Sequence, residues 1–114
     1  ARQFYHAIES HDVGFGERLK TAMAECRVVM EPFIRSRYDG ALDVTIEEIC
    51  DRMNTVRNGI AHSRLDLNLE AIHLSDLKII EELLYAMRLQ YLHIGSRSIQ
   101  IGIKKLFGEN IAVE

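Results

Sequence analysis

The chain has very little of what breaks helices or directs a protein to a membrane. Its 114 residues include one proline, two cysteines and no tryptophan. No apolar run reaches the roughly 18 residues that a membrane span needs. No signal-peptide pattern follows Ala1. We therefore expect a cytoplasmic protein with no membrane partner.

An excess of one charge is also missing. The chain carries 14 Lys and Arg against 17 Asp and Glu, a formal net charge of -3. Such a chain has no general attraction for polyanions, so any contact with nucleic acid must come from a local basic patch. The five histidines show no metal-ligand spacing. Cys26 and Cys50 lie on apolar helix faces, so we expect reduced core thiols and no metal or other cofactor.

Apolar residues spaced by three and four predict helices along most of the chain. The expected helices are residues 4–10, about 17–38, 45 to past 60, about 76–94, and 96–107. The prediction is all-α: a bundle of four main helices plus a partial N-terminal helix, in one domain spanning 1–114. The opening residues read as the tail of a helix already under way, so we expect a fragment of a longer chain.

Local signals suggest where these helices begin, bend and end. Thr45 is the expected N-cap of the third helix, with Glu48 completing a capping box, and Ser75 is the expected N-cap of the fourth. Pro32 should kink the second helix or end a turn there. Glycines at 95 and 108 are expected to stop the last two helices.

The same spacing predicts which side chains are buried. For the second helix they are Leu19, Met23, Cys26, Met30, Phe33 and Ile34. For the third they are Ile46, Ile49, Cys50, Met53, Val56 and Ile60. For the fourth they are Leu77, Ile80, Leu84, Met87, Tyr91 and Ile94, widened by Ile79 and Leu83. For the last they are Ile99, Ile103, Leu106 and Phe107.

One stretch, "TVRNGIAHS" at residues 55–63, combines this apolar face with polar chemistry. At about 100° per residue, Arg57 falls inside the buried stripe of the third helix, where a charge is costly without a partner. Asn54, Asn58 and His62 form a ridge beside it, each four residues from the next. Arg57 must therefore reach a buried carboxylate, a helix C-terminus or an anion in a cleft.

Arg57 and His62 lie about 140° and 7.5 Å apart on one straight helix, too far to share a small group. They converge if the helix loosens at Gly59, or if a second copy packs across a two-fold axis. The pair suits RNA cleavage. His62 can exchange a proton with the ribose 2′-hydroxyl or the leaving oxygen, and Arg57 can hold the phosphate. Asn58 can orient the histidine one turn away.

The segment Arg57-Asn58-Gly59-Ile60-Ala61-His62 resembles the signature of HEPN domains, an Arg, a polar residue and a His after four to six positions near a helix end. The helix order agrees, and "HAIES" at residues 6–10 weakly resembles the helix that precedes the C-terminal HEPN domain of ApeA-like bacterial proteins. The resemblance covers nearly the whole chain by helix order, but only six residues specifically.

The resemblance implies a homodimeric, metal-independent endoribonuclease that cuts single-stranded RNA and leaves a 2′,3′-cyclic phosphate, in bacterial defence or stress response. The paired Arg and His of two protomers would line one cleft. Arg57 and His62 would be catalytic, Asn58 supporting, and Glu9 a weak candidate. An N-terminal sensor domain or an antitoxin is a further expected partner.

The same residues can also have purely structural roles. Arg57 can pair with a carboxylate from another helix, and His62 can bind the last carbonyls of its own helix. Arg52 and Arg64 can form a phosphate-binding rim or belong to an ordinary solvated face. The rival function is a non-catalytic HEPN-type helical module that binds RNA or a nucleotide, or only its own copy.

Overall fold

The computed structural model describes residues 14–61 and 69–111, and this part of the chain is all-α, with five helices and no strand. The helices are α2 (Phe15–Glu25), α3 (Arg27–Arg37), α4 (Leu42–Ala61), α5 (Ala71–Tyr91) and α6 (Ser96–Phe107). The predicted fold class is therefore confirmed. The helix expected at residues 4–10 lies outside the described residues, as do Glu9, His62 and Arg64.

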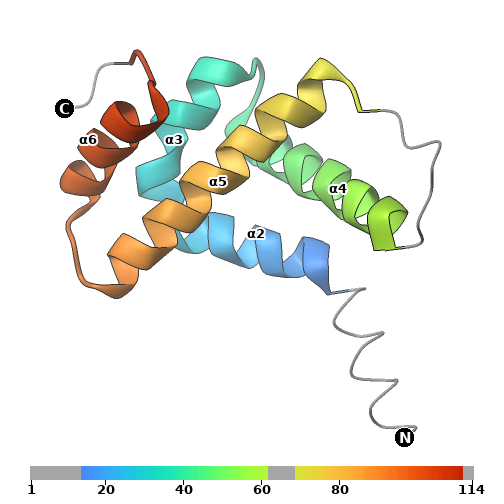
Figure 1. Ribbon diagram of the computed structural model, residues 1–114, viewed down its shortest axis with the longest axis horizontal. Helices are drawn as coiled ribbons and strands as arrows, with labels where there is room; N and C mark the ends of the chain where they lie inside the picture. Colours follow the sequence, from blue (N-terminus) through green and yellow to red (C-terminus); the bar gives the residue numbers. More distant parts are fainter. Residues whose placement is uncertain (1–13, 62–68, 112–114) are drawn as a thin grey trace, which may run out of the picture.

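Helix α5 is the centre of the arrangement (Figure 1). It packs against α3 and α6 on one side and α4 and α2 on the other, while α2 lies mainly on α4. The core between them is apolar, and its fully buried members include Met23, Met30, Phe33, Ile49 and Ile79. Within the described ranges, no helix is both long and apolar enough to cross a membrane.

The predicted second helix is two helices that meet at Cys26. Pro32 does not end α3 but lies inside it. Because proline has no N–H, the carbonyl of Val28 loses its usual helical donor, and Nε2 of Gln100 on α6 supplies one at 3.1 Å. At the break itself, Nε2 of Gln90 on α5 donates to the carbonyl of Glu25 at 3.0 Å. Side chains of neighbouring helices thus satisfy the carbonyls that the interruptions free.

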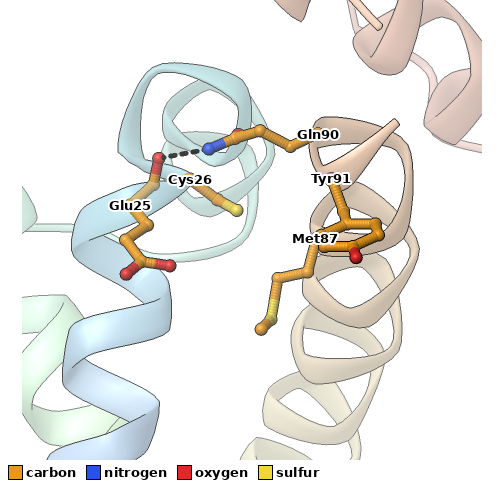
Figure 2. A pocket seen from close by; sticks show the side chains of 5 residues that line it. All are labelled: Glu25, Cys26, Met87, Gln90 and Tyr91. Atoms are coloured by element: carbon orange, nitrogen blue, oxygen red, sulfur yellow. Dashed lines mark hydrogen bonds between the residues drawn. The ribbon is translucent and has the colours of Figure 1, made fainter. Parts of the chain in front are cut away.

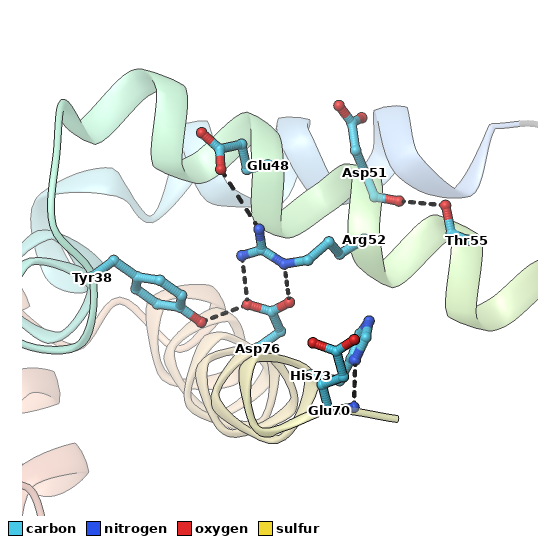
Figure 3. A network of polar contacts seen from close by, with 8 residues as sticks. All are labelled: Tyr38, Glu48, Asp51, Arg52, Thr55, Glu70, His73 and Asp76. Carbon is cyan, nitrogen blue, oxygen red and sulfur yellow. Dashed lines mark hydrogen bonds and ion pairs between the residues drawn. The ribbon is translucent and has the colours of Figure 1, made fainter. Parts of the chain in front are cut away.

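The expected starts of α4 and α5 are wrong by three to five residues. Helix α4 begins at Leu42, so Thr45 is an internal, buried residue rather than an N-cap. Helix α5 begins at Ala71 with Glu70 as N-cap, before Ser75. There the Glu70 N–H donates to Nδ1 of His73 at 2.9 Å, a contact drawn in Figure 3. His73 is the third residue of the helix, and its side chain binds the backbone N–H of the N-cap residue. This capping box forms in place of the predicted Ser75 cap.

The end of α5 also differs from the prediction. His93 adopts the left-handed conformation with φ 63°, and the N–H of Ile94 donates to the carbonyl of Leu89 at 3.1 Å. These are the features of a Schellman motif, which usually has glycine at the left-handed position. Gly95 instead precedes α6 as its N-cap. Gly108, with φ 68°, does end α6 as predicted.

Burial follows the predicted faces of α2, α3 and most of α4, but not that of α5. Its buried residues are Asp76, Ile79, Glu82, Leu83 and Ala86. From the expected stripe, Leu84 is 54% exposed and Tyr91 is 84% exposed. Two other predicted core residues, Ile60 and Leu106, are each 64% exposed. Helix α5 is thus rotated so that two carboxylates face inward and a leucine-rich stripe faces outward.

Candidate functional site

Arg57 lies in the last two turns of α4, at a pocket where α2, α4 and α5 meet. Its guanidinium carbon is 5.0 Å from the centroid of the Phe15 ring, within the range of a cation–π contact. The pocket has a volume of about 200 Å³. Its lining is apolar apart from the arginine and consists of Phe15, Met53, Val56, Arg57, Ile60, Leu77 and Ile80.

The half-buried position of Arg57 agrees with its predicted place within the apolar stripe of α4. A cation on an aromatic face keeps its charge while its planar faces are covered, so it can remain partly out of water. The arginine thus places one positive charge in an otherwise apolar wall.

Helix α4 continues without interruption through Gly59 to Ala61. The helix does not loosen at Gly59, which removes one of the two ways in which Arg57 and His62 were expected to converge. His62 and Arg64 lie outside the described residues, so the structure describes no distance between them and Arg57. Convergence through a second copy of the chain remains a prediction.

Of the expected polar ridge, the structure describes Asn54 and Asn58. Oδ1 of Asn54 accepts a hydrogen bond at 3.2 Å from the N–H of Gly16 in the first turn of α2. That N–H has no acceptor within α2, so Asn54 caps α2 from a neighbouring helix. Gly16 is buried, and a side chain there would press on Asn54 at 3.3 Å. Asn58 is half-buried one turn further along.

Arg52 serves an internal ion pair. Its Nε and Nη2 donate to the two carboxylate oxygens of Asp76 at 2.7 and 3.0 Å, and Nη1 lies 3.6 Å from Glu48 (Figure 3). The hydroxyl of Tyr38 donates to Asp76 Oδ1 at 2.6 Å. All three guanidinium nitrogens of Arg52 thus face carboxylates, and we leave this residue out of the proposed RNA contacts.

Asp76 is fully buried, and its carboxylate joins α3, α4 and α5 through these three hydrogen bonds. The bond to Asp76 raises the pKa of Arg52. Burial, followed by the same carboxylate, raises the pKa of Tyr38. The network keeps a buried negative charge matched by a positive one, which is the condition under which such a charge is tolerated. Sequence spacing did not indicate Asp76, although a half-buried Arg52 requires an acid nearby.

A second buried carboxyl, Glu82, lies on the inward face of α5 with no exposed surface. No hydrogen bond to either of its oxygens occurs within the described part of the chain. Burial, and next the charge of Glu109, raises the pKa of Glu82 to about 8, while Arg37 opposes the shift. Arg37 forms an ion pair with Glu109, which ties the segment after α6 to α3. Burial thus favours the neutral, protonated form of Glu82.

A second hollow lies where α2 gives way to α3, beside the C-terminal half of α5 (Figure 2). It is lined by Glu25, Cys26, Met87, Gln90 and Tyr91, and its volume is about 270 Å³. Burial raises the pKa of the Cys26 thiol, and Cys26 and Cys50 are both buried and free, as predicted. A buried thiol that resists ionisation is a poor nucleophile, so this hollow is not a cysteine active site.

Among the described residues, no group of His, Cys, Asp and Glu side chains could hold a metal ion. The buried and half-buried charged sites described above are an arginine in an apolar pocket and two clusters around the buried carboxyl groups of Asp76 and Glu82. Of these, only the arginine belongs to the predicted RNA-cleaving motif. In comparisons with protein-family models, curated proteins and solved structures, nothing matches this chain.

Proposed function

We propose that this chain is a HEPN-type, metal-independent endoribonuclease that acts as a homodimer on single-stranded RNA. The observation that carries the proposal is Arg57, held over Phe15 in an apolar pocket at the end of α4. His62 follows five positions later, one residue beyond the described end of that helix. This is the order and spacing that the RNA-cleaving motif needs.

Arg57 would contact the scissile phosphate and stabilise the negative charge that builds up on it. His62 would act as general acid or base, and Asn58 would orient it. The attacking group is the 2′-hydroxyl of the RNA itself. Its proton is removed as the oxygen bonds to phosphorus, and the 5′-oxygen of the next nucleotide leaves with a proton. The products are a 2′,3′-cyclic phosphate and a free 5′-hydroxyl.

The alternative is a non-catalytic HEPN-type helical module for binding RNA or a nucleotide, or for dimerisation. The contact with Phe15 supports it, because a guanidinium stacked on a ring can serve packing alone. Under this alternative Arg57 contributes to stability and not to chemistry. A role in bacterial defence or stress response, a cytoplasmic location, and a sensor domain or antitoxin as further partner remain predictions that go with the first proposal.

The test is cleavage of a pool of single-stranded RNAs in excess EDTA by the wild type, Arg57→Ala, His62→Ala and the control Arg97→Ala. Arg97 is an exposed arginine on α6, far from the motif in sequence. We expect the first two variants to lose about 10²-fold or more in rate, as general acid–base and charge-stabilising groups do, and the control to keep its rate. RNA with 2′-O-methyl groups should resist cleavage.

Thermal melting of the same four proteins separates the two functions. A folded but inactive Arg57→Ala protein supports the nuclease. Equal rates in all four proteins, or cleavage that stops in EDTA, would exclude it. An Arg57→Ala protein that loses its fold, together with a fully active His62→Ala protein, would support the packing role.

A further inference from the structure

Two acids and one arginine meet where the segment after α6 returns to the bundle beside α3 (Figure 1). Glu82 comes from the middle of α5, Arg37 is the last residue of α3, and Glu109 follows the glycine that ends α6. Arg37 forms an ion pair with Glu109, and the charge of Glu109 acts on Glu82. Glu82 is fully buried and Glu109 is only 7% exposed. Because water hardly reaches these carboxyl groups, the cluster has to balance its charge internally.

If both acids were ionised, this cluster would carry one negative charge more than its arginine balances. Carboxylate oxygens only accept hydrogen bonds, so two carboxylates that face each other repel and offer each other no donor. Both oxygens of Glu82 are buried with no donor among the described residues, yet they lie within hydrogen-bond reach of Glu109. A proton on Glu82 supplies the missing donor and brings the cluster to zero net charge. Two carboxyl groups that share a site hold one proton between them for the same reason.

Arg37 is the cation that acts most strongly on Glu82. Lys78, one turn earlier on α5, opposes the rise in the pKa of Glu82 less than Arg37 does. Nη2 of Arg37 is paired with Glu109, whereas its Nε is buried and has no acceptor among the described residues. The guanidinium therefore keeps a donor for a second carboxylate. It can pair with Glu109 while Glu82 is neutral, and with Glu82 once that group is charged.

Charged groups on the other neighbours of α5 have partners or surfaces of their own. Arg52 of α4 donates to both oxygens of the buried aspartate of α5 described above. Lys20 of α2 forms ion pairs with acids of α2 and α4. On α6, Lys104 and Lys105 line a hollow that Glu109 borders. The charge of the cluster is therefore set mainly by its arginine and its proton.

Of the two acids, Glu109 is the one that can move. Glu82 is fixed inside a helix of 21 residues, whereas Glu109 lies two residues beyond the last residue of α6. The N–H of Glu109 donates to the carbonyl of Lys104 at 3.1 Å, and its carboxylate holds Arg37. Ile111 packs against the core. Few contacts thus tie this segment down, so it opens at a lower cost than α5 itself.

We propose that Glu82, Arg37 and Glu109 form a proton-operated latch, in which neutral Glu82 donates a hydrogen bond to Glu109 and loss of its proton releases residues 108–111 from the bundle. When Glu82 ionises, it takes over the guanidinium of Arg37, and Glu109 loses both of its partners. One ion pair is exchanged for another, so no buried charge is left alone. The latch goes beyond the proposed nuclease and does not depend on it.

Fluorescence of Ile111→Trp tests the release. The chain has no tryptophan, so the new indole is the sole emitter of its kind. Its emission should shift to the red as the pH rises from 6.5 to 9.5, with a midpoint close to the Glu82 pKa of about 8. Helix content, followed by circular dichroism, should stay constant over this range. A loss of helix with the same midpoint would show global unfolding and overturn the local release.

Two further changes in the Ile111→Trp chain identify the group responsible. Glu82→Gln should keep the emission blue at every pH, because the amide retains a donor for Glu109 and never becomes charged. Glu81→Gln, the exposed neighbour on the same helix, should leave the red shift and its midpoint unchanged. A parent chain without any shift, or a shift of equal size in the Glu82→Gln chain, overturns the proposal.

Carbon-13 NMR of the Glu82 carboxyl group tests the same cluster without the indole, should that variant not fold. Glu109→Gln should lower the pKa of Glu82 by about one unit or more, because the repelling charge is gone and Arg37 is released. The control is Glu31→Gln, which removes the exposed partner of Arg35 on α3 and should leave the pKa of Glu82 unchanged. An equal pKa in the wild type and Glu109→Gln would show that burial alone holds the proton, and would overturn the latch.

Discussion

The carbonyl oxygen of Val28 accepts a hydrogen bond from Nε2 of Gln100 at the one place in α3 where Pro32 withholds the backbone donor. A residue of α6 thus compensates for an interruption in α3. The compensation should be measurable, because it is needed only while the proline is present.

We expect Gln100→Ala to lower the free energy of unfolding by about 0.5–1 kcal/mol in the wild type, the usual contribution of one hydrogen bond. In a Pro32→Ala background the new N–H serves the Val28 carbonyl, so the same change should cost much less. Urea unfolding of the wild type, the two single variants and the double variant gives the coupling free energy between positions 32 and 100. Gln90→Ala is the control, because its bond to Glu25 does not involve Pro32 and its cost should be equal in both backgrounds. Equal costs for Gln100→Ala would refute the compensation.

Removing the carboxylate at position 76 should destabilise the fold strongly. Asp76→Ala leaves the half-buried Arg52 without its bidentate partner and the Tyr38 hydroxyl without its acceptor. Loss of one member of a buried pair costs about 3 kcal/mol or more. Asp51→Ala, which removes an exposed partner of Lys20 on the same helix as Arg52, should cost about 0.5 kcal/mol at most. Chemical denaturation measures the free energy of unfolding of both variants. Similar losses of stability in the two would count against the network.

Stability should fall as the pH rises through neutrality, because of Glu82. Its pKa is about 8 in the folded chain, against about 4.3 for an unfolded glutamate. Between these values the folded state binds more protons, so the free energy of unfolding is highest below the lower pKa and is lost as pH rises through the upper one. The melting temperature should fall as the pH is raised from 5.5 to 8.5. Glu82→Gln should flatten the decline, and the exposed neighbour Glu81→Gln should leave it unchanged. A wild type with a flat profile would show that Glu82 is ionised in the fold.

The left-handed turn at His93 should favour glycine. A residue with a side chain at φ 63° costs about 1 kcal/mol relative to glycine. His93→Gly should therefore raise the free energy of unfolding by up to about 1 kcal/mol. Leu92→Gly, one position earlier at φ -83°, should lower it, because there glycine only adds freedom to the unfolded chain. A higher melting temperature for His93→Gly and a lower one for Leu92→Gly would confirm the turn. A lower melting temperature for both variants would contradict it.

Apolar spacing was sufficient to predict an all-α fold, and it placed Met23, Phe33 and Ile49 in the core. It failed on α5 for a physical reason. The stripe of Leu77, Leu84 and their neighbours is more apolar than the face that is buried. The buried face includes Asp76, whose charge is acceptable only because α3 and α4 supply Tyr38 and Arg52. Partners so distant along the chain are not visible in the periodicity of one helix.

The same limit applies to the candidate site. Helical spacing placed Arg57 on the inward side of α4, and the structure has it there, half-buried. Phe15, which covers the guanidinium, lies 42 residues earlier, in a segment that the sequence suggested as a break between helices. The helix boundaries were missed for a related reason. Backbone donors at Gly16 and Glu70 are satisfied by side chains that the simple capping patterns do not include.

Arg52 and Arg57 belong to the same helix, five residues apart. By holding both oxygens of Asp76, Arg52 fixes how α4 is turned about its own axis, and so fixes the direction in which Arg57 points. If the chain cleaves RNA as proposed, a random mutational scan scored by that activity would group Asp76 with Arg57, although the described contacts of its carboxylate are to Arg52 and Tyr38. A parallel measurement of protein abundance would separate the two residues.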